Sequence, residues 1–120
     1  MKRVLIVDDD MANRIILFSI LKNDINLDLE IDMAEEGLSA LKVLTKKKYD
    51  LVITDYKMPK MDGLELTKTI KMMFPETIVI LRSADSEVEN NSKMVGADLF
   101  LEKSCDLENF KNIVISLLSY

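Results

Sequence analysis

Two kinds of hydrophobic pattern alternate along the chain. Short aliphatic runs rich in Val, Ile and Leu are followed by longer segments whose apolar residues recur at helical spacing. Runs of the first kind predict β-strands, and segments of the second kind predict amphipathic helices. The predicted strands cover residues 2–7, 27–33, 50–55, 77–81 and 99–101. The predicted helices cover residues 11–21, 38–44, 64–73, 86–95 and 106–119.

Local signals mark where the helices begin and end. Asp9 or Asp10 can cap the first helix and Asp106 the last, because an Asp side chain accepts hydrogen bonds from the free amides of a first turn. Pro75 closes the third helix and Gly96 the fourth. The apolar residues at helical spacing in the first helix are Ile15, Ile16, Phe18, Ile20 and Leu21. Those expected to face the core from the second, fourth and last helices are Leu38, Leu41, Val43, Leu44, Val88, Met94, Val95, Leu107, Phe110, Ile113, Val114, Leu117 and Leu118.

The strands differ in polarity, and this predicts their places in a sheet. Residues 27–33 alternate between apolar and acidic positions, which indicates a strand with one wet face near a sheet edge. Residues 51–54 are almost wholly apolar between two aspartates, which indicates a strand buried on both faces. Five strand–helix alternations with short loops predict an α/β fold, with a parallel sheet, right-handed crossovers and helices on both faces.

Polar residues follow four of the five strands. All carboxyl ends of a parallel sheet meet at one edge, where open α/β sheets bind ligands. Asp8 and Asp9 follow the first strand, and Asp55 ends the third. Ser83 and Lys103 follow the fourth and fifth strands. The topology therefore gathers acids, a hydroxyl and an amine, although Asp55 alone can also be interpreted as the start of a turn.

Composition narrows the class of protein. A length of 120 residues suits one domain, taken as 1–120, and 48% hydrophobic residues suffice for a core. A net charge of −5 argues against a nucleic-acid surface, and the lysines at 46–48 are interpreted as a solvated helix end. The lone Cys105 excludes an internal disulfide and fits a reducing compartment such as the cytoplasm; a reactive thiol is the alternative. No apolar run reaches the ~20 residues of a membrane span.

Several short motifs stand in a fixed order on this pattern. They are VLIVDDD at 4–10, DLVITD at 50–55, MPKMDG at 58–63, SA at 83–84, GA at 96–97, and Lys103. With these residues the chain resembles a response-regulator receiver domain over residues 2–118. The resemblance implies a flavodoxin-like, doubly wound fold with five helices and the strand order 2-1-3-4-5.

The resemblance also implies the chemistry of the acids. Asp55 matches the phosphoacceptor, since a carboxylate can attack phosphorus and form an acyl phosphate. Asp8, Asp9 and Asp55 would repel one another without a cation, so they form an oxygen-rich pocket that suits Mg²⁺. The backbone carbonyl of Lys57 is a further metal ligand by resemblance. The alternative for residues 8–10 is an acid-rich helix start, and this is the interpretation adopted for Asp10.

Five positions outside the acidic cluster match functional places in the family. Lys103 is expected to pair with a phosphoryl oxygen, and Ser83 resembles the switch hydroxyl. Phe100 stands at the switch aromatic; without a hydroxyl it is predicted to point inward more often than Tyr, with ordinary core packing as the alternative. Lys57 and Asp85 flank the path of the hydrolytic water. We expect an ion pair between them that prolongs the phosphorylated state.

Two positions depart from the usual pattern. Ser104 follows Lys103 where the family usually has proline, often after a cis bond. A cis bond costs roughly 3–4 kcal/mol before a non-proline residue and about 0.5–1 kcal/mol before proline. The bond between residues 103 and 104 is therefore either trans within a rebuilt loop or strained. Arg82, next to Ser83, either supplies charge to the site or points into water.

The sequence thus favours a phosphoacceptor switch, not a turnover enzyme. The chain has no histidine, so the phosphohistidine donor is expected on a partner, a histidine kinase or histidine phosphotransfer protein that docks near the first helix. The face built from the helix at 86–95, the last strand and the last helix is expected to shift and bind a downstream target or output domain. The alternatives are a phosphorylation-independent interaction module and a phosphohydrolase; Lys57 argues against the latter, which would carry a second Asp there. The sequence leaves open whether the chain acts alone or within a longer protein.

Overall fold

Five parallel strands form the centre of the computed structural model, which describes residues 1–119. The strands are β1 (Lys2–Val7), β2 (Leu29–Ala34), β3 (Leu51–Asp55), β4 (Ile78–Ser83) and β5 (Leu99–Glu102). They lie in the order β2-β1-β3-β4-β5, and every neighbouring pair is parallel. The predicted α/β class and strand order are confirmed. Residues 27–33 were correctly predicted to form an edge strand, although β2 starts two residues later.

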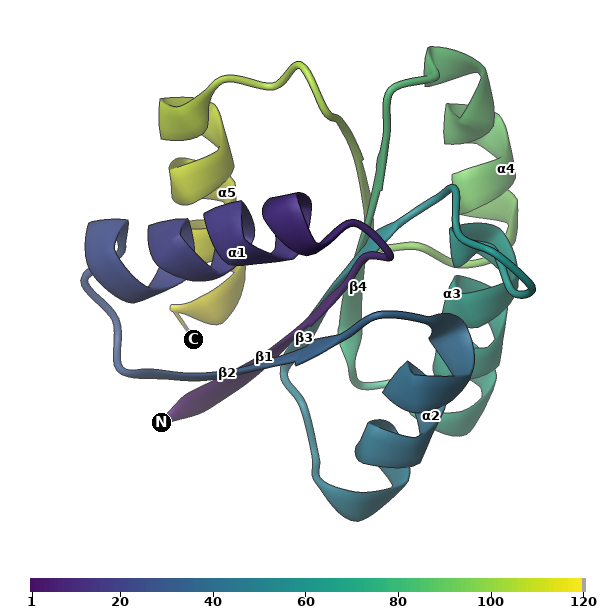
Figure 1. Cartoon of the computed structure of the whole chain (residues 1–120), viewed down its shortest axis with the longest axis horizontal. Coiled ribbons are helices and arrows are strands. Elements are labelled where there is room, and N and C mark those ends of the chain that lie inside the picture. Colours follow the sequence, from purple (N-terminus) through teal and green to yellow (C-terminus); the bar gives the residue numbers. More distant parts are fainter. Residues whose placement is uncertain (120) are drawn as a thin grey trace.

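Helices cover both faces of the sheet (Figure 1). They are α1 (Met11–Ser19), α2 (Gly37–Lys46), α3 (Gly63–Met73), α4 (Glu89–Met94) and α5 (Leu107–Leu118). α1 and α5 lie on one face, and α2, α3 and α4 lie on the other (Figure 1). A π-helical turn, η1 (Ile20–Asp24), extends α1, and a 3₁₀ turn, η2 (Ser86–Val88), precedes α4.

The central strand β3 separates two hydrophobic cores. All five of its residues are buried, as the apolar run predicted. On the α1/α5 face, Ile6, Ile53 and Ile80 form a row across β1, β3 and β4. On the other face, Val52 and Val79 pack with Leu66 and Ile70 of α3. Because apolar contacts hold β3 on both sides, the residue at its carboxyl end occupies a fixed position.

The buried stripe of the first helix agrees with the prediction only in part. Leu21 is buried as predicted, and Phe18 and Ile20 are partly buried against the same core. Ile15 and Ile16 are 54% and 55% exposed, whereas Leu17, Leu21 and Ile25 are buried. Leu17 lies on α1, Leu21 lies on η1, and Ile25 follows directly after η1; all three belong to the same core. The helix has more apolar residues than its sheet-facing stripe accommodates, so hydrophobicity alone could not identify the inner face.

The fourth helix is also shorter than predicted. Residues 86–88 form a 3₁₀ turn, which has fewer residues per turn than an α-helix and so shifts the positions that face inward. Val88 is buried as expected, but Met94 is 84% exposed and Ser92 is buried in its place. At the other helices, Leu38 and Leu107 are exposed because they lie in the first turn, at the rim of the core.

The predicted caps are present. The carboxylate of Asp10, and not that of Asp9, accepts a hydrogen bond from the Ala12 amide at the start of α1. Asp106 caps α5 in the same way by accepting from Asn109. Gly96 follows α4 with a φ of 92°, a conformation that glycine adopts at little cost.

Gly63 fixes the loop after β3. Its amide donates to the carbonyl of Tyr56 at 2.7 Å, which closes the loop on itself. A Cβ atom at position 63 would lie 2.2 Å from the backbone oxygen of Asp55. The first residue of α3 therefore rests directly on the end of β3, and only glycine fits there.

We predict that Gly63→Ala destabilises the protein by about 1–3 kcal/mol, because backbone must move to remove the clash. Gly37→Ala is the matched control, since a Cβ there meets only the flexible side chain of Met61. Its effect should stay below about 1 kcal/mol, because alanine also favours the helix. Urea unfolding of both variants measures the difference. Equal losses would contradict the role assigned to Gly63.

Candidate functional site

A charged row continues the apolar row at the carboxyl edge of the sheet. Side chains two residues apart on a strand share a face, so Asp8, Asp55 and Arg82 follow Ile6, Ile53 and Ile80 on the α1/α5 side. The register places Arg82 of β4 directly beside Asp55 of β3. The sheet therefore places two acids and an arginine at the ends of three successive strands, β1, β3 and β4.

Three carboxylates form a cluster at this edge. One oxygen from each of Asp8, Asp9 and Asp55 lies within 4.8 Å of the others. Asp8 and Asp55 are 1% and 5% exposed, whereas Asp9 is open to solvent. Asp8 accepts a hydrogen bond from the Asp10 amide through Oδ1 at 2.9 Å. Its Oδ2 is buried and has no hydrogen-bond partner within residues 1–119.

The environment of Asp8 opposes its charge. Burial raises the pKa of Asp8, and the Asp55 and Asp9 carboxylates raise it further; the Asp10 amide and Lys103 partly offset this. An unpartnered oxygen and two close carboxylates are features that a bound cation would stabilise. Asp8, Asp9 and Asp55 fit a hard divalent ion such as Mg²⁺, which prefers carboxylate oxygens and keeps several waters.

Lys103 completes the cluster with a positive charge. Its Nζ lies 2.8 Å from Oδ1 of Asp55. The Lys103 amide donates a hydrogen bond to the carbonyl of Ser83, and this bond holds the end of β5 next to the end of β4. Residues 1–119 contain no cis peptide bond, so the bond to Ser104 is trans. The Cys105 amide donates to the Glu102 carbonyl in a rebuilt turn, and this turn keeps the lysine within reach of Asp55.

Ser83 is buried at the carboxyl end of β4, and strand alternation places it on the opposite face from Arg82. Its Oγ accepts a hydrogen bond from the amide of Asp85 at 3.0 Å. The carboxylate of Asp85 in turn accepts from Glu87 and caps η2. Within the described chain no ion pair joins Asp85 to Lys57, so that prediction is wrong. The cap holds Asp85 at its own turn, and Lys57 is exposed to water.

Phe100 lies on β5, paired with Leu81 of β4. Strand alternation places it on the α4 side of the sheet, opposite Leu101. Its side chain is half-buried, and a preference for an inward pose stays a prediction.

Sequence reasoning missed two features beside the site. Arg14 of α1 donates from Nη1 to the backbone carbonyl of Asp8 at 2.6 Å. Met11, Ile15 and Ile16 are each more than half exposed on α1, which begins just after the acids. The signal for the second feature was present, because α1 has more apolar residues than its buried stripe can use.

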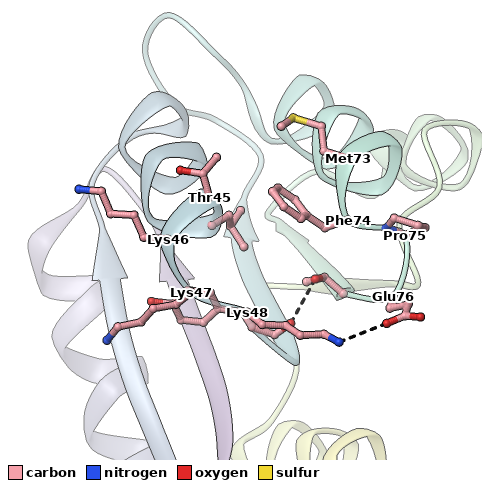
Figure 2. Close-up of a pocket in the computed structure, with 11 residues that line it drawn as sticks. Thr45, Lys46, Lys47, Lys48, Met73, Phe74, Pro75 and Glu76 are labelled. Carbon is pink, nitrogen blue, oxygen red and sulfur yellow. Dashed lines mark hydrogen bonds and ion pairs between the residues drawn. The ribbon is translucent and has the colours of Figure 1, made fainter.

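A cavity of about 480 Å³ lies away from this cluster, at the ends of α2 and α3 (Figure 2). Leu44, Tyr49, Met73 and Phe74 are among its lining residues. Lys48 and Glu76 form an exposed ion pair of 3.4 Å at its edge. None of the three clustered acids lines this cavity, so it is separate from the candidate chemistry.

Comparison with known families agrees with this geometry. The profile of the response regulator receiver domain matches residues 4–115. The chain belongs to this family. Members are switches of two-component signalling, and an acidic pocket that binds Mg²⁺ is characteristic of receiver domains.

Curated relatives of this receiver domain differ in length. The sporulation initiation phosphotransferase F of Bacillus subtilis is 33% identical over 115 residues, which are 94% of this chain and 90% of the relative. A protein-glutamate methylesterase/protein-glutamine glutaminase of Methanospirillum hungatei is 32% identical over 94% of the chain. The match spans only 34% of that longer protein.

Solved receiver structures superimpose closely on this one. Response regulator TrrA of Thermotoga maritima, solved in complex with Mg²⁺-BeF, is 37% identical with a TM-score of 0.88, over 98% of this chain and all of TrrA. Chemotaxis protein CheY4 of Vibrio cholerae is 28% identical with a TM-score of 0.87, over 98% of this chain and 99% of its own. Within residues 1–119, no helix of this receiver domain has the length and apolar character needed to span a membrane.

We predict that Asp8→Asn stabilises the metal-free receiver domain at pH 7 by about 1–2 kcal/mol, the scale of relieving one buried charge repulsion. The Asn oxygen can keep the hydrogen bond from Asp10, and its amide can donate to a neighbouring carboxylate. Thermal unfolding in EDTA measures the gain. Mg²⁺ should stabilise the wild type and have little effect on the variant, because a ligand stabilises only the state that binds it.

The same experiment has a defined pH dependence. The pKa of Asp8 is raised in the folded state, so its ionisation costs stability at neutral pH. As pH falls through this raised pKa, the folded wild type takes up a proton that the unfolded chain does not bind. The advantage of the Asn variant should therefore shrink toward acid pH. A wild type as stable as the variant in EDTA at pH 7 would contradict the assignment.

Proposed function

We propose that this receiver domain is a phosphoacceptor switch in which Asp55 receives a phosphoryl group from a phosphohistidine on a partner protein. The observation that carries the proposal is the environment of Asp55. Its carboxylate is 5% exposed at the end of the central strand, contacts Lys103 at 2.8 Å, and lies within the acidic cluster. None of these 120 residues can carry the phosphohistidine, because the sequence contains no histidine.

The transfer is a direct displacement at phosphorus. An oxygen of Asp55 bonds to phosphorus while the bond to the imidazole nitrogen of the donor breaks, and that nitrogen keeps the electron pair and takes a proton. Lys103 can follow the transferred group because its ammonium already lies at Oδ1 of Asp55. Positioning and charge neutralisation are the main requirements of phosphoryl transfer. A bound Mg²⁺ would be held by Asp8, Asp9, Asp55 and the carbonyl of Lys57. It would neutralise negative charge on the equatorial oxygens of the phosphoryl group.

Two relatives support this assignment. The Bacillus subtilis relative is named a phosphotransferase and is covered over 90% of its length. TrrA was solved with Mg²⁺-BeF and is 37% identical to this chain. The exposed residues Met11, Ile15 and Ile16 suggest where a histidine kinase or phosphotransfer protein docks, since exposed apolar patches beside a site commonly mark a protein interface.

Phosphorylation would then shift the opposite side of the site. The Ser83 hydroxyl, which now accepts from the Asp85 amide, would donate to a phosphoryl oxygen and draw the β4–α4 loop inward. Phe100 would follow into the space beside β4. The face formed by α4, β5 and α5 would thereby favour a second conformer and a downstream target. α4 has only six residues, so few backbone hydrogen bonds resist this movement.

We predict that Asp55→Asn abolishes labelling by acetyl phosphate and Mg²⁺, because an amide oxygen does not form the acyl phosphate. Asp10→Asn is the matched control, since Asn caps a helix as well as Asp does. Intact-mass spectrometry should show one added phosphoryl group on the wild type and the control, and none when EDTA is present. Labelling of the Asp55 variant would contradict the proposed acceptor. Continuous phosphate release without an accumulated phosphorylated form would indicate a hydrolase, and a wild type that neither becomes labelled nor releases phosphate would indicate an interaction module.

Lys57 and Asp85 are proposed to set the lifetime of the phosphorylated state from either side of the water path. Both side chains are exposed, and in the part of the chain that the structure describes no ion pair joins them, so each is expected to act separately. We expect Lys57→Ala to shorten the lifetime several-fold by opening the path to in-line water. The exposed Lys68→Ala on α3 is the control for loss of one charge. Decay of the labelled fraction with time measures both, and identical decay would remove Lys57 from this role.

A further inference from the structure

Arg82 is the one member of the charged row that the proposed phosphoacceptor chemistry does not use. It lies beside Asp55 in the register of β3 and β4, on the same face of the sheet. Asp8 lies one strand further along the same row. Neighbouring strands are about 4.8 Å apart, so the base of the Arg82 side chain lies next to Asp55 and about twice that spacing from Asp8.

The guanidinium of Arg82 has no partner of its own. Within residues 1–119 it makes no ion pair and no hydrogen bond, although the residue is largely shielded from water. Burial lowers the pKa of Arg82, while the carboxylates of Asp8 and Asp55 oppose that shift. An arginine remains charged even so, and a half-buried cation without a direct partner is costly unless nearby charges compensate it.

The compensating charges belong to the acidic cluster. When all groups are ionised, three carboxylates and the Lys103 ammonium leave two uncompensated negative charges. Arg82 reduces this surplus to one, and the half-buried Arg14, which donates to the backbone carbonyl of Asp8, is a second cation beside the cluster. Lys103 already contacts Oδ1 of Asp55, whereas Arg82 makes no ion pair within residues 1–119 and so acts on the cluster through space.

We propose that Arg82 is a built-in counter-cation of the acidic cluster, which stabilises the metal-free site and weakens its affinity for Mg²⁺. This inference rests on the proposed magnesium-dependent function. Arg82 is a positioning residue and not a metal ligand, since it acts only through the electric field at the carboxylates. A fixed positive charge repels an incoming divalent ion and also lowers the repulsion that the ion would relieve.

Arg82 also has space to respond when the charge at Asp55 changes. With Lys103, Cys105 and Phe110 it lines a cavity of about 160 Å³ between α1 and α5. A long side chain bordering such a cavity can change rotamer without displacing the packed core. The guanidinium can therefore move toward Asp55 when phosphorylation adds negative charge there.

Mg²⁺ binding to purified protein tests the proposal directly. Arg82→Met and Arg82→Gln remove the charge, one with an apolar and one with a polar side chain, and Arg82→Lys retains it. Arg3→Met is the matched control, because Arg3 is a half-exposed arginine of the same sheet that pairs with Glu30 at the far end of β1. Isothermal titration with Mg²⁺ gives each dissociation constant, and thermal unfolding with and without Mg²⁺ gives the linked stability.

We expect the two neutral variants to bind Mg²⁺ about three- to tenfold more tightly than the wild type, the scale of one nearby charge at a half-buried site. The lysine variant should stay close to wild type, and so should Arg3→Met. The neutral variants should also be less stable in EDTA and gain more from Mg²⁺. If Arg82 acted only through packing, the neutral variants would be less stable both in EDTA and with Mg²⁺. Their affinity for Mg²⁺ would then equal that of the wild type.

The outcomes separate the two proposals. If the wild type binds Mg²⁺ and the neutral variants match it, the counter-cation role is wrong and the proposed function stands. If the wild type does not bind Mg²⁺, or binds it equally well after Asp8→Asn, the magnesium-dependent function itself fails. If Arg82→Met does not fold, Arg82→Gln and Arg82→Lys still give the comparison of neutral with charged side chains.

Discussion

The main constraint on this site is electrostatic repulsion between the carboxylates at the ends of two central strands, β1 and β3. The other features of the site reduce this repulsion. Asp8 and Asp55 are nearly inaccessible to water and lie close to the exposed Asp9. Such groups destabilise a fold unless cations or donors compensate them. In this protein an ammonium, a backbone amide and a nearby guanidinium provide that compensation. The remaining imbalance makes the site receptive to a divalent ion.

The parallel sheet makes this concentration of charge possible. Two apolar cores hold β1 and β3 from both faces, so their carboxyl ends cannot separate to relieve the repulsion. Short loops then bring Ser83 and Lys103 to the same edge. Part of the free energy gained by packing the apolar rows thus offsets the charge repulsion in the acidic cluster. This is a common relation between a core and a functional site.

Much of this arrangement could be predicted from the sequence. The alternation of strands and helices fixed the parallel topology, and that topology alone brought Asp8, Asp55 and Lys103 together. The inner face of the first helix was predicted only in part, because this segment has more apolar residues than its inner stripe holds: Ile15 and Ile16 were expected inside, and Leu17 lies there instead. The pairing of Lys57 with Asp85 failed for a different reason. A local capping bond to Glu87 holds Asp85 at its own turn, and short-range bonds of this kind are hard to weigh against longer-range ones.

The closed loop after β3 has a consequence for how such domains diversify. The Gly63 amide ties back to the Tyr56 carbonyl, and the Gly63 backbone rests on the end of β3. Lys57 and Lys60 are exposed side chains of this loop, whose ends are already held together. Mutations at these two exposed positions can accumulate without displacing the acceptor. Signalling kinetics can therefore evolve independently of the reacting group.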